Sequence, residues 1–251
     1  MVAGSHTTDT PASLTYSSVV SRDSVQIALT IAALSGLKVL GADIENAYLM
    51  APCPEKIYTT AGPKFGSECG KTMLIVCALY GLKTSGAAFH SFLADHLHDM
   101  GFRPSRADPD VWLKPGIKDD GTKYWEMILC YVDDVLAISH NPKKALEGIQ
   151  KKFKLKDDKM EIPDNYLRAD LSQMDNVDRD ICWAMSSDKY CQALVKNVEE
   201  ILSKKGLSLP TKCFTPLKSG YKPELDCTGE LKAEGLQFYQ ELIGSLRWAV
   251  C

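Results

Sequence analysis

The sequence lacks any apolar stretch that approaches the roughly 20 residues required by a membrane-spanning helix. Apolar runs such as 127–131 and 135–138 are far shorter. We therefore expect no transmembrane segment and no membrane partner. The chain also has little net charge: the formal value is −3 over 251 residues, so a nucleic-acid partner has to be argued from local features and not from global electrostatics.

Paired cysteine motifs are missing as well. The nine cysteines include no Cys-x-x-Cys pair and no His partner at zinc-site spacing, so we expect no structural zinc. Their odd number, and the positions of Cys77 and Cys130 inside apolar segments, favour free thiols in a reducing compartment. No basic region followed by an apolar stretch opens the sequence, so we expect a cytoplasmic protein without a secretory signal.

The composition that remains is typical of a folded globular chain, with 45% hydrophobic and 24% charged residues. Helical periodicity, with Ser21 and Ser85 as N-caps, predicts helices at 21–36, 85–101 and 142–153. Short β-rich runs predict strands at 37–42, 73–79, 112–114, 123–131, 135–138 and 166–171, and the Asp120-Gly121 pair predicts a hairpin turn before the strand at 123–131. Residues 50–71 read as irregular because of their Pro and Gly content. After about residue 186 the pattern is mainly helical, with helical periodicity over 190–202 and 238–250, so we expect an α+β chain with domains 1–185 and 186–251.

An Asp-Asp pair interrupts the most β-rich part of the chain. The runs 127–132 and 135–138 are separated only by Asp133 and Asp134, so the sequence predicts that this pair forms a hairpin tip. Two adjacent carboxylates on an apolar hairpin repel each other unless a cation binds there, and Mg²⁺ prefers such oxygen ligands. Asp43 ends another predicted strand. Three carboxylates of this kind, holding two metal ions, are typical of nucleotidyl transfer.

Five segments, in this order, resemble those of the reverse transcriptases of copia-type retrotransposons. They are residues 43–49 (Asp-Ile-Glu-Asn-Ala-Tyr-Leu), 79–85 (Leu-Tyr-Gly-Leu-Lys-Thr-Ser), 131–134 (Tyr-Val-Asp-Asp), 190–202 with 215–216 (Thr-Pro), and 242–246 (Leu-Ile-Gly-Ser-Leu). The resemblance implies an RNA-directed DNA polymerase with the right-hand fold. Residues 1–185 would form partial fingers and a ferredoxin-like palm with a split βαβ sheet. Residues 186–251 would form a mostly helical, thumb-like connection region.

The resemblance also implies roles for individual residues. The catalytic metal ligands would be Asp43, Asp133 and Asp134, holding two Mg²⁺ ions, with Mn²⁺ as the alternative. The nucleotide pocket would be bordered by Tyr48, which would exclude a 2′-hydroxyl, and by Tyr80 and Gly81. The primer-holding segment would contain Tyr166, Leu167 and Arg168, although Arg168 stands where the family usually has Gly. Implied partners are an RNA or DNA template with its primer, deoxynucleoside triphosphates and other segments of the same polyprotein, within a cytoplasmic retroelement particle.

Both ends of the sequence differ from the family pattern. Relatives carry a basic Lys-x-Arg segment just before the residues that resemble 2–4, and an RNase H module after the thumb-like region. We therefore expect a polyprotein fragment whose nucleotide affinity and processive extension are impaired by missing fingers cations.

Other interpretations of the same residues stay open. A catalytically inactive remnant that only binds nucleic acid is one alternative, and an RNA-directed RNA polymerase is another, against which Tyr48 argues. Without the catalytic role, Asp133 and Asp134 would form a solvated turn and Asp43 a cap, while Tyr48 would serve core packing. The pair Tyr80-Gly81 would then be a plain turn after a strand.

Overall fold

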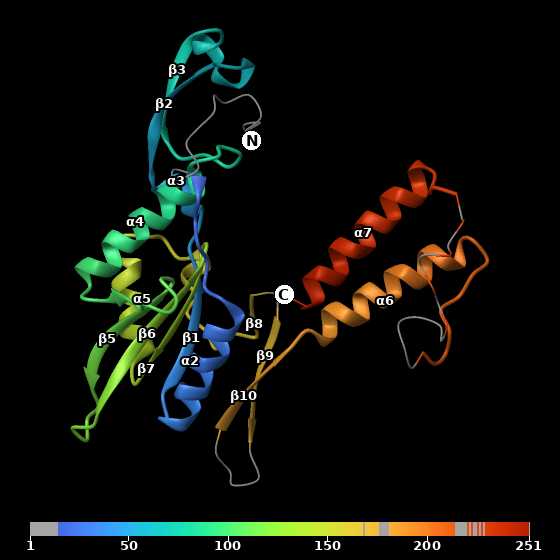
Figure 1. The fold of residues 1–251 in the computed structure, drawn as a ribbon. Coiled ribbons are helices and arrows are strands. Elements are labelled where there is room, and N and C mark those ends of the chain that lie inside the picture. The colour runs from blue at the N-terminus through green and yellow to red at the C-terminus, as the bar shows by residue number, and fades with distance from the viewer. Residues whose placement is uncertain are drawn as a thin grey trace. The chain divides into compact units, whose positions relative to one another are not determined.

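The computed structural model describes residues 15–167, 169–175, 181–213 and 229–250, together with residues 220, 222, 225 and 227. The chain divides into two compact units, one formed by Met1–Leu167 with Leu171–Ala184 and the other by Arg168–Asp170 with Met185–Cys251. Helices and strands are mixed, so the fold is α+β (Figure 1). Among the described residues, no helix combines the length and the apolar character needed to cross a membrane.

A five-stranded antiparallel sheet in the order β1-β7-β6-β5-β4 forms the centre of the first unit. Its strands are β1 (Lys38–Asp43), β4 (Arg103–Pro104), β5 (Val111–Ile117), β6 (Lys123–Tyr131) and β7 (Asp134–Ser139). Because β1 and β6 both pair antiparallel with β7, they run in the same direction with β7 between them. The Asp120-Gly121 turn joins β5 to β6 as predicted, with Gly121 at φ 83°.

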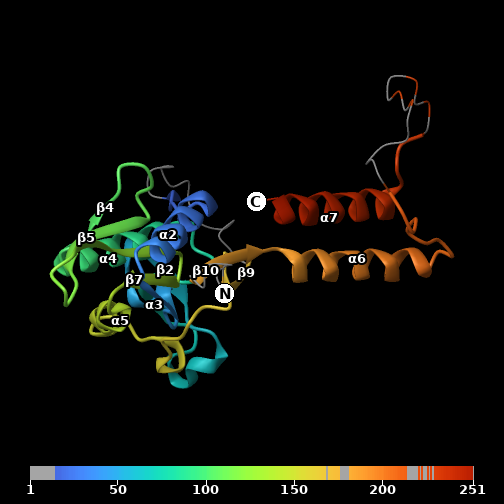
Figure 2. The same cartoon turned by 90° about the horizontal axis from the view of Figure 1, so that it is seen from below.

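Helices cover both faces of this sheet. The helix α2 (Arg22–Leu34) lies on one face, whereas α4 (Ser85–Asp99) and α5 (Pro142–Gln150) lie on the other (Figures 1 and 2). The core under α4 and α5 contains Phe89, Leu97, Leu146, Ile149 and Phe153, all buried. Successive residues of β7 alternate between the two faces, so Val135 and Ala137 enter this core while Asp134 lies on the α2 face.

The helix ends follow the capping rules with two corrections. Ser21 caps α2 by accepting a hydrogen bond from the Ser24 amide, as predicted, whereas the N-cap of α4 is Thr84 and not Ser85. Asn141 caps α5, which ends at Gln150, three residues earlier than predicted. Phe153 is nevertheless fully buried, so the apolar periodicity located the core contact correctly but not the helix end.

The prediction of an irregular 50–71 segment was wrong in part. Most of it forms β2 (Pro52–Thr60), which pairs antiparallel with β3 (Thr72–Cys77) in a separate two-stranded sheet. The short helix α3 (Ala47–Met50) precedes this hairpin, and the 3-10 helix η2 (Pro63–Glu68) lies in the loop between its two strands. In a two-stranded sheet both strands are edges, and there proline is tolerated because one row of amide groups has no ladder partner.

The single strand predicted at 166–171 is interrupted. The structure has β8 (Asn165–Tyr166), then Leu167 at φ 52°, then β9 (Ala169–Asp175), which pairs with β10 (Ile181–Ser186) in a three-stranded sheet. A short turn, η3 (Lys156–Asp158), precedes these strands. The positive φ at Leu167 ends β8, because a strand requires negative φ values.

The second unit contains α6 (Asp188–Ser203) and α7 (Ala233–Val250). The Tyr190 hydroxyl donates a 3.0 Å hydrogen bond to the carbonyl of Ser245, and the Lys205 ammonium lies 5.8 Å from the centre of the Phe238 ring. The predicted helices at 190–202 and 238–250 are therefore confirmed within longer elements. The Thr215-Pro216 pair lies outside the described residues.

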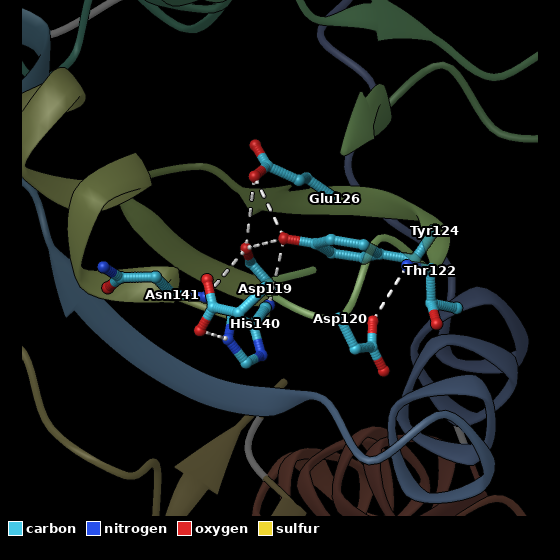
Figure 3. Close-up of polar contacts among 8 residues, drawn as sticks. Asp119, Asp120, Thr122, Tyr124, Glu126, His140 and Asn141 are labelled. Carbon is cyan, nitrogen blue, oxygen red and sulfur yellow. Dashed lines mark hydrogen bonds and ion pairs between the residues drawn. The ribbon is translucent and has the colours of Figure 1, made fainter. Parts of the chain in front are cut away.

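A polar cluster fixes the connection from β7 to α5 (Figure 3). The Tyr124 hydroxyl lies 3.0 Å from the Ser139 hydroxyl and accepts a 3.2 Å hydrogen bond from the His140 amide. It also donates to Glu126 at 3.2 Å. Gly116 lies under the Tyr124 ring, where a Cβ atom would come within 2.8 Å of two ring carbons. This cluster holds the end of β7 and the start of α5 against β6.

Candidate active site

The sheet places two of the predicted carboxylates directly opposite each other. Asp43, the last residue of β1, is the register partner of Asp134, the first residue of β7. Asp134 pairs on its other side with Tyr131 of β6. Directly opposed residues of antiparallel strands have Cβ atoms about 4.5–5.5 Å apart on the same face. The Asp43 and Asp134 side chains therefore share one face of the sheet.

The predicted hairpin tip was displaced by one residue. The two central residues of the turn are Val132 and Asp133, because Asp134 already belongs to β7. Val132 has φ 56°, an unfavourable conformation for a β-branched residue. The tip is held against β1 by a 2.9 Å hydrogen bond from the Ile44 amide to the Asp133 carbonyl. Asp133 is thus kept beside the Asp43–Asp134 pair by the backbone.

Burial and mutual repulsion disfavour the charged forms of these acids. Burial, followed by the charges of Asp133 and Asp43, raises the pKa of Asp134 to about 6. Burial is also the main cause of a raised pKa at Asp133, with a further contribution from Asp43. Lys156 opposes both shifts. The site therefore concentrates more negative charge than its own surroundings neutralise.

Among the described residues, Lys156 contacts this carboxylate group with a positive charge. Its ammonium nitrogen lies 3.4 Å from Asp43 Oδ2. The backbone around it runs along the free edge of β1: Leu155 forms a bridge with Ile44, and the Glu45 amide donates to the Lys154 carbonyl at 2.8 Å. Lys156 therefore reaches Asp43 from a segment that the backbone fixes to the same strand.

The donor set fits a hard divalent cation. Three carboxylates on adjacent β segments, two of them with raised pKa values, provide oxygen ligands and an excess of negative charge. Within the described part of the chain, no three His, Cys, Asp or Glu side chains are already arranged around a common point as a metal cage. A cation bound by Asp43 would meet the Lys156 ammonium, so the approach of metal and the position of Lys156 are linked.

Two predicted nucleotide-site tyrosines lie together beside the carboxylates. The rings of Tyr48 and Tyr80 have centroids 4.7 Å apart. Burial raises the pKa of both phenols, and the charge of Asp133 adds to the effect in each. Tyr48 also packs edge-on against Phe89, with a centroid distance of 6.2 Å, which ties its ring to the core. Gly81 follows at φ 101°, a conformation that favours glycine.

The residues predicted to hold the primer have other environments. Tyr166 is buried, and its hydroxyl donates a 3.0 Å hydrogen bond to the Leu129 carbonyl of β6. Burial raises its pKa well above the usual value for tyrosine. Its side chain therefore supports the sheet from inside. Leu167 occupies the turn after β8, and Arg168 lies outside the described residues.

A cavity of about 280 Å³ opens beside the acids. Asp43, Asp134 and Lys156 line one part of its wall, and Asn165 with Tyr166 lines another. Gly41 also borders it, and a Cβ atom at Gly41 would lie 3.4 Å from Pro163. The cavity gives the carboxylates access to a small polar ligand.

Sequence reasoning missed two contacts of this region. The first is the contact between Lys156 and Asp43, which are 113 residues apart in the sequence. No sequence signal used above pointed to Lys156, and its place beside Asp43 follows from the bridge between Ile44 and Leu155. The second is a 2.7 Å contact between His90 Nε2 on α4 and Asp110 Oδ1. Asp110 is fully buried and its carbonyl accepts from the amide of Cys130, next to Tyr131 in β6.

Residues 3–212 match the family model described as reverse transcriptase (RNA-dependent DNA polymerase). Among curated proteins, the retrovirus-related Pol polyprotein from transposon RE1 of Arabidopsis thaliana is 28% identical over 151 residues. The corresponding polyprotein from transposon RE2 of the same plant is 26% identical over 150 residues. Each match covers 57% of this chain and 10% of the relative, so the matched segment represents about a tenth of those polyproteins.

Proposed function

Because this chain belongs to the reverse transcriptase (RNA-dependent DNA polymerase) family, we propose that it carries out RNA-directed DNA synthesis within a transposon Pol polyprotein of the copia type. The observation that supports this activity best is the register that sets Asp43 opposite Asp134, with Asp133 at the adjoining tip. In this proposal the five-stranded sheet with α4 and α5 is the palm. The β2–β3 hairpin belongs to partial fingers, and α6 with α7 forms a thumb-like region.

The proposed ligands of two Mg²⁺ ions are Asp43, Asp133 and Asp134, and Mn²⁺ is the alternative metal. Such ions, when bound, would activate a primer 3′-hydroxyl for attack and stabilise the leaving pyrophosphate. The chain contributes the positioning. Val135 and the three residues after it are buried, so Asp134 is fixed at the end of a rigid strand. The hydrogen bond between Ile44 and Asp133 keeps the third carboxylate at the same place.

The paired tyrosines are proposed to border the nucleotide. The Tyr48 ring contacts both Phe89 and Tyr80, and these two contacts restrict its movement away from a ligand. A rigid ring beside the acids would collide with a 2′-hydroxyl and favour deoxynucleoside triphosphates. Gly81 would let the backbone approach the same ligand closely, since it has no side chain.

The proposed partners are an RNA or DNA template with its primer, deoxynucleoside triphosphates and other segments of the polyprotein. Primer extension on an RNA template with Mg²⁺ tests the activity. Asp133→Asn should lower extension by about 100-fold or more, since each carboxylate is needed to hold the metal pair. Asp119→Asn is the matched control, because Asp119 is 95% exposed and belongs to another Asp-Asp pair, beside His140. It should retain extension.

Template–primer binding, measured by fluorescence anisotropy, distinguishes the two candidate functions. A polymerase should bind template–primer in both variants and extend it only when Asp133 is intact. Binding without extension in the unmodified chain would instead identify a nucleic-acid-binding module. Equal extension by Asp133→Asn and the unmodified chain would refute the carboxylate assignment.

A further inference from the structure

We propose that Lys156 is a built-in counter-ion of the carboxylate site, which competes with the first divalent cation for Asp43 and so sets the metal affinity. This inference rests on the proposed function, because it concerns the same metal ligands. In the absence of metal, the ammonium reduces repulsion among the three acids. When a divalent cation binds, Lys156 has to give up its contact with Asp43.

The position of Lys156 is fixed by the backbone and not by a flexible arm alone. The bridge between Leu155 and Ile44 sets the residue before Lys156 against the residue after Asp43. Leu155 is fully buried, so this attachment is part of the core. The turn that follows is tight, with Asp157 and Asp158 both at positive φ (53° and 51°). Two successive non-glycine residues in this conformation are unusual, and they return the chain toward β1.

The same charge contributes to every acid of the site. Lys156 contacts Asp43 directly, and it also lowers the pKa of Asp133 and of Asp134 against the opposing effects of burial and repulsion. A divalent ion at these carboxylates would lie only a few ångströms from the Lys156 ammonium, whose backbone is held beside β1 while its side chain is 62% exposed. Like charges at about 6 Å, across water and at ordinary ionic strength, weaken binding of a divalent ion by about three- to tenfold.

Lys154 provides a matched comparison within the same segment. Its ammonium lies 2.6 Å from Glu45 Oε2, and this contact raises the pKa of Lys154. Both lysines are thus exposed and each pairs with an acid near the end of β1, but only Lys156 reaches a proposed metal ligand. Removing the Lys154 charge should therefore leave the metal site nearly unchanged.

The test is a Mn²⁺ titration of the full chain without nucleic acid, with free Mn²⁺ followed by electron paramagnetic resonance at about pH 8. Lys156→Gln should bind Mn²⁺ about three- to tenfold more tightly, and higher KCl should reduce the difference. Lys156→Arg should restore an affinity close to that of the unmodified chain, because the charge is kept. Lys154→Gln should stay within about twofold of the unmodified chain.

A double-mutant cycle identifies the contact responsible. If Lys156 acts through Asp43, its substitution should have a smaller effect in an Asp43→Asn background. An unchanged or weaker Mn²⁺ affinity in Lys156→Gln would overturn the inference, and so would an effect that persists in full without Asp43. A different result would count against the proposed function. In that result, the unmodified chain binds no Mn²⁺, or binds Mn²⁺ equally well after Asp133→Asn.

Discussion

Replacing Asp134 by Asn should stabilise the metal-free protein at neutral pH. The pKa of Asp134 is raised from 3.8 to about 6, because burial and two neighbouring acids disfavour its charged form. An acid with a raised pKa costs stability as the pH rises: the penalty is absent below about 3.8 and complete above about 6. The full difference is equivalent to about 3 kcal/mol. Because Asp134 is partly exposed, solvent screening reduces this, and we expect a gain of about 1–2 kcal/mol for Asn.

Thermal denaturation in the presence of a chelator measures this gain. At pH 7.5 the Asp134→Asn variant should melt about 2–8 °C above the unmodified protein, since 1 kcal/mol is equivalent to about 2–4 °C at this size. At pH 4.5 the difference should fall to about a third, because Asp134 is then protonated in the folded state. Asp95→Asn, an exposed acid on α4, is the control and should show neither effect. A variant that melts lower at pH 7.5, or a gain independent of pH, would refute the repulsion argument.

Three further predictions concern the nucleotide pocket, the Tyr124 cluster and the buried Asp110 carboxylate. Tyr48→Val should increase ribonucleotide over deoxynucleotide incorporation in primer extension, and unchanged selectivity would exclude a steric gate. Gly116→Ala should lower the free energy of unfolding by about 1–3 kcal/mol in urea titrations, because its Cβ would clash with the Tyr124 ring at 2.8 Å. In a Tyr124→Ala background, where the ring is absent, Gly116→Ala should no longer lower the free energy of unfolding by this amount. His90→Leu should cost about 3–5 kcal/mol in the same assay by leaving the buried Asp110 carboxylate without its 2.7 Å partner. A loss that persists in an Asp110→Asn background would argue against this cause.

Local signals in the sequence predicted the elements that carry the acids. Ser21 as a cap and Asp120-Gly121 as a turn were correct, because each depends on the chemistry of a few adjacent residues. The strand ending at residue 42 was correct to within one position, and Asp43 completes it. The family resemblance supplied the role of Asp43, whereas its register with Asp134 became visible only in the sheet.

The errors have a common physical cause, which is that long-range pairing overrides local preference. Val132 has low preference for positive φ, yet the pairing of Tyr131 with Asp134 forces it into the turn. The Pro and Gly content of residues 50–71 predicted an irregular segment, yet Pro52 begins the strand β2. Proline is tolerated there because β2 is an edge strand. Lys156 could not be predicted at all, since its contact depends on how the segment after α5 returns to β1.

The fixed register of β7 links the stability of the fold to the geometry of the site. Residues 135–138 are all at most 1% exposed, and they alternate between the α2 face and the core under α4 and α5. A slip by one residue would move every one of these side chains to the wrong face, and it would turn Asp134 toward the apolar core. The apolar residues of β7 therefore hold Asp134 opposite Asp43 against the repulsion between them. The strain at Val132 is tolerated for the same reason, because relaxing the turn would require the buried part of the strand to move.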